Sequence, residues 1–399
     1  MDFRIFDADQ HYYEAEDCFT RYASQRMVKE KFVRWVTEAD GKRRRLFVGG
    51  KAANVIGNPT FDPITAPGIY HETLKKLEVG KDRSAEAYGK LEPIRPAYRD
   101  KGVRLGVMDE QGVEKTLMFP TLGVTMEGFI SDDVDMLYDC FHAFNRWMED
   151  DWGFAYRDRI FAAPYLSMLD LNRAMAELEW ALKQGARLIT IRPGPAYGRS
   201  PADPYFDPFW ALIQEAGVLV TYHAFEGPSD VGDAYHRLWA APPQPRLREH
   251  ALLRSVIAGI DNAIMDTLSA LVLHNLFGRF PRLKVATIEM GASWVPYLLT
   301  RLDHAGGLVN RRISSFGGTL TDTPSEIFKQ HIWVAPFPEE DVPALARLIG
   351  AEHVLMGSDW PHAEGMSRPS DYLHCLEGLD SQAIKHIMHD NIQGLVDRQ

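Results

Sequence analysis

Short apolar runs that end in polar residues alternate along this chain with longer segments whose apolar residues recur every three or four positions. The short runs cover residues 4–9, 114–119, 159–166, 187–192, 217–223, 283–289, 331–335 and 353–359. Several are almost wholly apolar, which is typical of parallel strands buried on both faces. Strands that alternate with helices predict an α/β fold. A total of eight favours a closed (β/α)8 TIM barrel over an open, doubly wound sheet.

The longer segments carry the periodicity of amphipathic helices. Residues 137–148 place apolar side chains at spacings of three and four, which gives one apolar stripe. Residues 171–182 repeat this pattern after the third run, with Asp170 in the position of an N-cap and Gly185 as the stop. The sequence therefore predicts a helix after the second run and another after the third.

Two long segments are additional to the strands and helices of a minimal barrel. Residues 12 to about 105 follow the first strand and contain a predicted hairpin, with strands at 32–36 and 44–48 and a turn at 39–41. Residues 226–262 follow the fifth strand. Since loops that follow barrel strands gather on the catalytic face, we expect both insertions to cover it. A second domain is the alternative, but the first insertion has too few apolar residues for a core of its own, so residues 1–399 are expected to form one domain.

Composition excludes several classes of protein. Forty-four Lys and Arg against 55 Asp and Glu give a net charge of −11, and no long basic run offsets it, so we expect no nucleic-acid or anionic-lipid partner. Three scattered cysteines without C-x-x-C spacing exclude a disulfide scaffold and a cysteine zinc site. No apolar run is long enough to span a bilayer, and the N-terminus lacks the pattern of a signal peptide. A cytoplasmic protein is expected.

Candidate metal ligands stand at the ends of three predicted strands. Asp9 and His11 end the first strand at a spacing that puts both side chains on one side. His223 ends the fifth strand and Asp359 the eighth. Taken alone, each of these four residues could have a purely structural role, such as a helix cap for an Asp or a core histidine. Together, two imidazoles and two carboxylates at the carboxyl ends of barrel strands predict a site for Zn, Fe or Mn.

Several motifs together resemble the amidohydrolase superfamily, in its branch related to aminocarboxymuconate-semialdehyde decarboxylase and the aromatic-acid decarboxylases. They are residues 6–11 (FDADQH), 108–113 (MDEQGV), 277–284 (FGRFPRLK), 357–362 (GSDWPH) and 389–392 (HDNI). Asp9 stands where members of the branch carry His or Glu. The resemblance implies a metal-dependent enzyme that acts on a small molecule, and a homodimer.

The sixth strand departs from this pattern, because it ends in Glu289 where decarboxylases of the branch carry a catalytic His. A carboxylate can bind or bridge metal ions or act as a base, but it does not replace an imidazole near neutral pH. Glu289 is therefore predicted as a metal ligand and, with Asp359, as a catalytic residue. A buried ion pair that stabilises the barrel is the alternative for Glu289.

Other residues near the motifs are candidates for substrate binding. Arg192 ends the fourth strand and suits a carboxylate or phosphate, with a structural ion pair as the alternative. Trp360 and His362 flank Asp359, and His362 is expected to orient it. His274 is either a core histidine or a ligand of a second ion. We expect one bound ion, with a second as the alternative.

The residues favour hydrolysis over decarboxylation. A metal-activated water would attack an ester, thioester, lactone or amide carbonyl, with Asp359 or Glu289 taking its proton. The alternative is non-oxidative decarboxylation of an aromatic or unsaturated acid, which the family branch favours and Glu289 disfavours. A metal-free binding protein is the third alternative, which the intact ligand set argues against.

Overall fold

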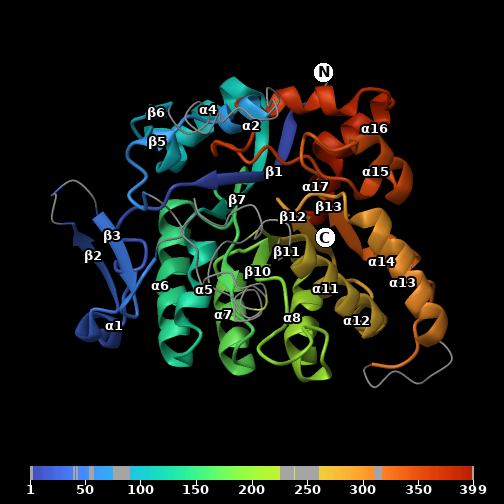
Figure 1. The fold of residues 1–399 in the computed structure, drawn as a ribbon, viewed down its shortest axis with the longest axis horizontal. Helices are drawn as coiled ribbons and strands as arrows, with labels where there is room; N and C mark the ends of the chain where they lie inside the picture. Colours follow the sequence, from blue (N-terminus) through green and yellow to red (C-terminus); the bar gives the residue numbers. More distant parts are fainter. Residues whose placement is uncertain are drawn as a thin grey trace.

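A ring of parallel strands forms the centre of the molecule (Figure 1). The computed structural model describes residues 3–38, 41, 44–53, 58–74, 90–224, 238, 260–309 and 317–397. The barrel strands are β1 (Ile5–Tyr12), β7 (Val113–Pro120), β8 (Ile160–Ala162), β9 (Tyr165–Leu166), β10 (Leu188–Ile191), β11 (Leu219–His223), β12 (Val285–Ile288) and β13 (Ile332–Val334). Each pairs in parallel with its neighbour in the barrel, as the apolar runs predict.

The third predicted strand is divided in two. Its first half, β8, pairs with β7, and its second half, β9, pairs with β10. Pro164 lies between them and has no N–H to donate, but its carbonyl accepts a hydrogen bond from the Thr190 N–H at 3.0 Å. The barrel wall is therefore continuous across this break.

The eighth predicted strand, residues 353–359, does not form a regular strand. Single parallel bridges join Val334 to Val354 and Gln10 to Trp360. The Ala8 N–H also donates to the Met356 carbonyl at 2.9 Å. These contacts place the segment between β13 and β1, so it still closes the eight-membered (β/α)8 barrel.

Helices cover the outside of the strands, and α6, α7 and α8 stand in a row along one side (Figure 1). The helices of the barrel layer are α4 (Lys101–Gln111), α5 (Glu127–Ile130), α6 (Val134–Asp151), α7 (Leu171–Lys183), α8 (Asp207–Ala216), α11 (Ile260–Leu273), α12 (Leu276–Arg279), α13 (Val295–Val309), α14 (Pro324–His331), α15 (Val342–Ile349), α16 (Ser381–Lys385) and α17 (Asn391–Val396). Both helices predicted from periodicity are confirmed, and Asp170 caps α7 by accepting from the Arg173 N–H. None of the described helices is long and apolar enough to cross a membrane.

Two layers of buried side chains hold the barrel together. Inside the ring, Phe6, Leu117, Phe161, Leu188 and Leu219 form one cluster. Ile392, Leu395 and Val396 of α17 belong to the same cluster. A larger cluster fills the space between strands and helices and extends into the first insertion. Burial on both faces explains why the strands read as apolar runs.

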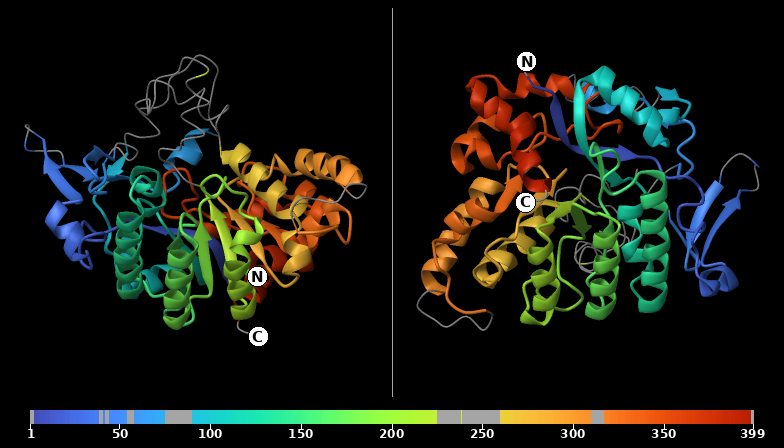
Figure 2. Two further views of the ribbon diagram at one scale, coloured as in Figure 1. Left: turned by 90° about the horizontal axis from the view of Figure 1, so that it is seen from below. Right: turned by 180° about the vertical axis from the view of Figure 1, so that it is seen from behind.

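The first insertion forms a small antiparallel sheet at the edge of the molecule (Figure 2). Its described elements are α1 (Gln25–Glu30), β2 (Val33–Thr37), β3 (Arg44–Val48), β4 (Lys51–Ala52), β5 (Ile64–Thr65), α2 (Ile69–Leu74) and β6 (Leu91–Glu92). The predicted hairpin is confirmed as β2 and β3, while residues 39 and 40 of its turn lie outside the described residues. Of the second insertion, residues 226–237 and 239–259 also lie outside them.

Part of the first insertion reaches the carboxyl ends of the strands. The Gly68 N–H donates to the His362 carbonyl at 3.0 Å, and the Tyr70 N–H donates to the Ala363 carbonyl at 2.8 Å. These bonds hold α2 against the loop that follows the eighth segment. Buried residues of the insertion also belong to the same outer apolar cluster as the barrel residues. That residues 1–399 form one domain stays a prediction.

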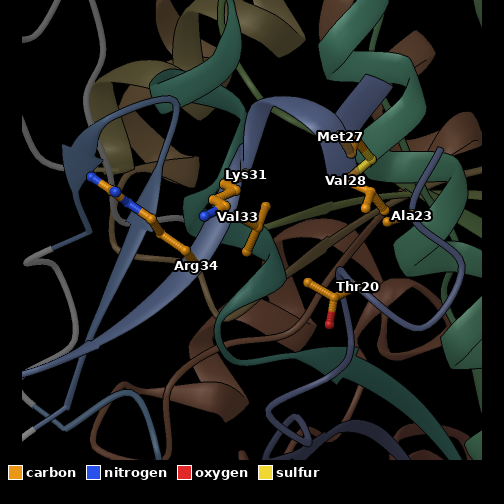
Figure 3. Close-up of a pocket in the computed structure, with 7 residues that line it drawn as sticks. All are labelled: Thr20, Ala23, Met27, Val28, Lys31, Val33 and Arg34. Carbon is orange, nitrogen blue, oxygen red and sulfur yellow. The ribbon is translucent and has the colours of Figure 1, made fainter. Parts of the chain in front are cut away.

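A shallow pocket of about 270 Å³ lies between α1 and β2 in the first insertion (Figure 3). Met27, Val28 and Val33 supply apolar side chains to its wall, beside Lys31 and Arg34. None of the predicted metal ligands or catalytic residues lines it. The pocket is therefore separate from the chemistry at the strand ends.

Candidate metal centre

A bulge in β1 directs the first two candidate ligands into the barrel. Asp7 pairs with Thr116 and Gln10 with Met118, so β1 carries one extra residue between these pairs. Such a bulge changes the direction in which the following side chains point. Phe6 belongs to the inner apolar cluster, and His11 lies beyond the bulge among the polar groups at the strand ends.

Asp9, His11, His223 and Glu289 form a compact set, which we call the imidazole cluster; one ligand atom of each lies within 4.8 Å of the others. The Nε2 atoms of the two histidines are 3.2 Å apart. Asp9 Oδ1 lies 3.4 Å from His11 Nε2 and 3.5 Å from His223 Nε2. Glu289 Oε2 lies 3.3 Å from His223 Nε2. Donor atoms around an ion at about 2.1 Å are separated by about 3 Å or slightly more, so these distances suit a divalent metal.

The tautomer of His223 also suits metal binding. Its Nδ1 lies 2.7 Å from the Ala224 carbonyl, which can only accept, so Nδ1 carries the proton. In the neutral ring, Nε2 then presents its lone pair to Asp9 and Glu289. A hydrogen bond from the far nitrogen to a carbonyl is the usual support of a metal-binding histidine.

Asp359 lies beside this cluster and belongs to a second set. Its Oδ1 is 3.4 Å from His11 Nε2 and 2.7 Å from His362 Nδ1. Glu289, Asp359, His362 and Glu364 bring one ligand atom each within 4.8 Å of one another, and we call them the carboxylate cluster. The predicted ligands therefore lie close together, but they are divided between the imidazole cluster and the carboxylate cluster. Glu289 belongs to both.

Two of the acids sit on unusual backbone. Glu289 and Asp359 both have a φ of 54°, in the left-handed region that side-chain-bearing residues rarely adopt. Each directly follows a barrel strand or its equivalent, and the turn there carries its side chain toward the other acid. Backbone strain of this kind is concentrated at functional sites.

Burial and the proximity of several carboxylates determine the pKa values of the acids in this site. Burial, then the charges of Asp359 and Asp9, raises the pKa of Glu289 well above its usual value. Burial and the charges of Glu364 and Asp9 likewise raise the pKa of Asp359. Burial also opposes ionisation of Asp9, but the neighbouring imidazoles of His11 and His223, 3.4 and 3.5 Å from Asp9 Oδ1, outweigh it and lower the pKa of Asp9. The protein alone thus stabilises only part of this negative charge.

The residues fit a divalent cation. Asp9 Oδ1 and Asp359 Oδ1 are buried and have no hydrogen-bond partner. Leaving a buried carboxylate oxygen unpaired is costly, because its desolvation is not compensated. Carboxylate oxygens and imidazole nitrogens in this arrangement are the ligands of zinc, iron and manganese sites.

Comparison with known proteins identifies the family of this chain. A family model described as Amidohydrolase matches residues 91–397. An amidohydrolase of known structure from Mycobacterium avium subsp. paratuberculosis K-10 is 35% identical over 100% of both chains, with a TM-score of 0.88. The chain belongs to the amidohydrolase family. The predicted superfamily is therefore confirmed.

Other solved amidohydrolase-like structures are more distant. A 5-carboxyvanillate decarboxylase from Novosphingobium aromaticivorans DSM 12444, solved with manganese, is 16% identical over 99% of this chain and 97% of its own, with a TM-score of 0.64. A 2,6-dihydroxybenzoate decarboxylase from Rhizobium is 18% identical over 84% of this chain and 96% of its own, with a TM-score of 0.57. At 16% and 18% sequence identity, the similarity to these two structures establishes only a shared barrel fold. Comparison with curated proteins gives no match.

Three predicted residues of this amidohydrolase lie outside both clusters. Trp360 is only 3% exposed, and its ring packs against Tyr98 and the guanidinium of Arg104, so the structure gives it a packing role. His274 Nδ1 lies 2.7 Å from Ser200 Oγ, which does not support a second-ion ligand. Arg192 is half-buried, near two tyrosines that donate to Glu127. Substrate binding by Arg192 and Trp360 stays a prediction.

A network of buried hydrogen bonds holds β1 in place. Asp7 accepts from Ser358 Oγ at 2.6 Å and from Gln10 Nε2 at 2.9 Å. The fully buried Arg104 donates to Gln10 Oε1 at 3.1 Å and to the His11 carbonyl at 2.7 Å. These bonds fix the backbone that presents His11. Sequence reasoning did not identify Asp7 and Arg104, although the Asp-x-Asp spacing at residues 7–9 was a signal.

Gly357 fixes the position of Asp9. A Cβ at residue 357 would lie 2.8 Å from Asp9 Cβ, closer than packing allows. We therefore expect Gly357→Ala to displace Asp9 and to weaken metal binding by about 10–100-fold, as loss of a group that orients a ligand does. Metal titration measures this. Gly106→Ala, where an added Cβ meets nothing within 4 Å, is the control, and equal affinity in both variants would contradict the prediction.

Proposed function

We propose that this amidohydrolase is a metal-dependent hydrolase of a small ester, thioester, lactone or amide. The observation that carries the proposal is the position of Glu289, which supplies a carboxylate to the imidazole cluster from the end of β12. Its side chain is 20% exposed, against 4% for Asp9 and 2% for His223. Glu289 is therefore the member of this cluster that faces an incoming substrate and water.

Asp9, His11, His223 and Asp359, with Glu289, would hold the metal, which we propose to be zinc, iron or manganese. When bound, a divalent cation supplies Lewis-acid chemistry, because it polarises a carbonyl oxygen and lowers the pKa of water. The proposal is for one ion in this cluster, held by the two imidazoles and the acids around them.

Glu289 would then act as the base. Its side chain is 20% exposed, against 1% for His11, 4% for Asp9 and 2% for His223, so water can reach this carboxylate and give it a proton. As the water oxygen attacks the carbonyl carbon, Glu289 takes one proton from the water. When the bond to the leaving group breaks, the same carboxyl group returns that proton to the departing oxygen, sulfur or nitrogen.

Asp359 and His362 would complete the site. The His362 ring stacks on the His11 ring at 4.0 Å, and its Nδ1 lies 2.7 Å from Asp359 Oδ1. The proposal that His362 orients Asp359 rests on this proximity. Arg192 remains our proposal for binding an anionic part of the substrate, because its guanidinium suits a carboxylate or phosphate.

Decarboxylation of an aromatic or unsaturated acid is the second candidate function. The observation in its favour is that solved structures with this fold include manganese-containing decarboxylases. Against it, a carboxylate at residue 289 opposes the approach of a substrate carboxylate, which carries the same charge. We therefore rank hydrolysis first.

An assay of both reactions distinguishes these functions. The full chain, loaded with Mn²⁺ or Zn²⁺, is incubated with panels of esters, thioesters, lactones and amides and, separately, with hydroxybenzoates. We expect hydrolysis of at least one member of the first panel and no CO₂ from the second. The His223→Ala protein, purified in the same way, controls for contaminating esterases. Release of CO₂ without any hydrolysis would contradict the proposal and favour the decarboxylase.

A further inference from the structure

An acid in the loop after β13 is hydrogen-bonded to the turn that carries Glu289. Glu340 Oε1 accepts from the Ser293 N–H at 2.7 Å and from Ser293 Oγ, and Glu340 Oε2 accepts from the Ala292 N–H at 2.8 Å. The Phe337 N–H, in the same loop as Glu340, donates to Oε2 at 2.8 Å. A carboxylate offers about four acceptor positions, so these donors satisfy Glu340.

These hydrogen bonds differ from those of an ordinary helix cap. α13 begins at Val295, and a capping side chain would accept from N–H groups inside the first turn of that helix. Ala292 and Ser293 instead precede the helix, in the turn between β12 and α13. Glu340 therefore fixes this turn and not the helix.

Packing holds the same turn against the loop that contains Glu340. Gly291 has a φ of 61°, and a Cβ there would lie 2.9 Å from the Phe337 ring and 3.3 Å from Glu340 Oε1. The turn thus lies directly on the loop after β13. That loop is itself joined to the barrel, because the Ala335 N–H donates to the Thr287 carbonyl of β12 at 3.0 Å.

The position of Glu289 requires such support. Its φ of 54° is costly for a residue with a side chain, and such a conformation persists only where the surrounding structure imposes it. Asp9 and Asp359 each share a cluster with Glu289, and their charges repel its carboxylate. Glu289 Oε2 nevertheless lies 3.3 Å from His223 Nε2. Glu340 binds the third and fourth residues after Glu289, so it restrains the backbone that directs this side chain.

We propose that Glu340 is a positioning residue, which sets the carboxylate of Glu289 in the imidazole cluster by holding the turn after β12. Glu340 belongs to neither cluster, so it acts through Glu289. The inference rests on the proposed function in one respect, the assignment of Glu289 as a metal ligand. The placement of Glu289 beside His223 does not depend on that assignment and is tested separately.

Glu340→Ala removes both acceptor oxygens, and Glu340→Gln keeps one of them. Asp341→Ala is the matched control, because Asp341 is the next acid along the loop and accepts from the Ala344 N–H of α15 at 2.9 Å. The Mn²⁺ affinity of each full-length protein is measured by titration, and Glu340→Ala is also measured in a Glu289→Ala background. Crystal structures of the metal-free wild type and of Glu340→Ala give the distance from Glu289 Oε2 to His223 Nε2.

We expect Glu340→Ala to bind Mn²⁺ about 10–100-fold more weakly than the wild type, as loss of a group that orients a ligand does, and Glu340→Gln to lie between them. Asp341→Ala should keep wild-type affinity. In the Glu289→Ala background, Glu340→Ala should change the affinity by less than about twofold, because substitutions that act through one group are not additive. In the crystal structure of Glu340→Ala, Glu289 Oε2 should lie farther from His223 Nε2 than 3.3 Å.

Wild-type affinity in Glu340→Ala would overturn the proposal. Equal weakening with and without Glu289 would also overturn it, since a residue that only stabilises the fold has that effect. If Glu340→Ala does not fold, Glu340→Gln undergoes the same measurements with the same criteria. A wild type that binds no Mn²⁺ would contradict the proposed function alone. The crystal structures then decide, and a Glu289 that stays beside His223 in the variant would overturn the positioning role.

Discussion

His223→Ala and His11→Ala are each expected to lose bound metal and activity while the barrel stays folded. Both imidazoles lie at the centre of the imidazole cluster, with their Nε2 atoms 3.2 Å apart and facing the acids. Removing either takes away a direct ligand. The loss should exceed the about 10–100-fold that follows from removing an outer partner of a ligand.

The fold should persist because residues at the carboxyl ends of barrel strands serve chemistry, whereas stability resides mainly elsewhere in the barrel. Metal analysis and circular dichroism on the same samples measure both effects. His304→Ala is the matched control, since His304 is exposed on α13 and belongs to neither cluster. Full metal content in either variant would show that the ligand assignment is wrong.

Glu289→Gln is expected to lower turnover by about 10²–10⁴, the usual contribution of a general acid or base. It should also lower metal occupancy, because a neutral amide is a weaker ligand than a carboxylate. Glu289 Oε2 lies 3.3 Å from His223 Nε2 and 3.8 Å from His11 Nε2, so the substitution acts inside the cluster. Steady-state kinetics and metal analysis of one preparation measure both quantities.

Turnover and metal content, measured together, distinguish the possible roles of Glu289. Reduced turnover with full metal content would indicate a base that is not a ligand. Normal turnover together with normal metal content would show that Glu289 only packs against the barrel. The exposed Glu377→Gln serves as the control for the change from acid to amide. Release of CO₂ from an aromatic acid by Glu289→His would favour the decarboxylase function.

The sequence predicted the eight apolar runs because a strand that is buried on both faces is apolar along its whole length. It predicted the helices between them because an amphipathic helix repeats its apolar residues every 3.6 positions. Both patterns are properties of local segments. The hairpin of the first insertion was predictable for the same reason. The eighth strand was predicted wrongly as regular. Its apolar run is real, but isolated bridges at Val354 and Trp360 and separate backbone hydrogen bonds, such as that from Ala8 N–H to the Met356 carbonyl, join the segment to its neighbours in place of a regular ladder.

The identities of the candidate ligands also came from the sequence, because polar residues that end apolar strands face one side of a barrel. Asp9, His11, His223, Glu289 and Asp359 were all named in this way, and the structure brings them together. Glu364 was not, since an exposed acid in a loop has no distinctive pattern. Only its distance from Asp359 and His362 makes it a candidate.

The sequence by itself determined which residue types stand at the strand ends, since that depends on the order of residues within each strand. Tertiary structure decided how those residues are grouped. The bulge in β1 and the left-handed backbone at Glu289 and Asp359 set the direction of each side chain. Barrel closure then brings Asp9 and Asp359, 350 positions apart, next to each other. Distances between such segments depend on the packing of the whole barrel, and local sequence patterns carry no record of them.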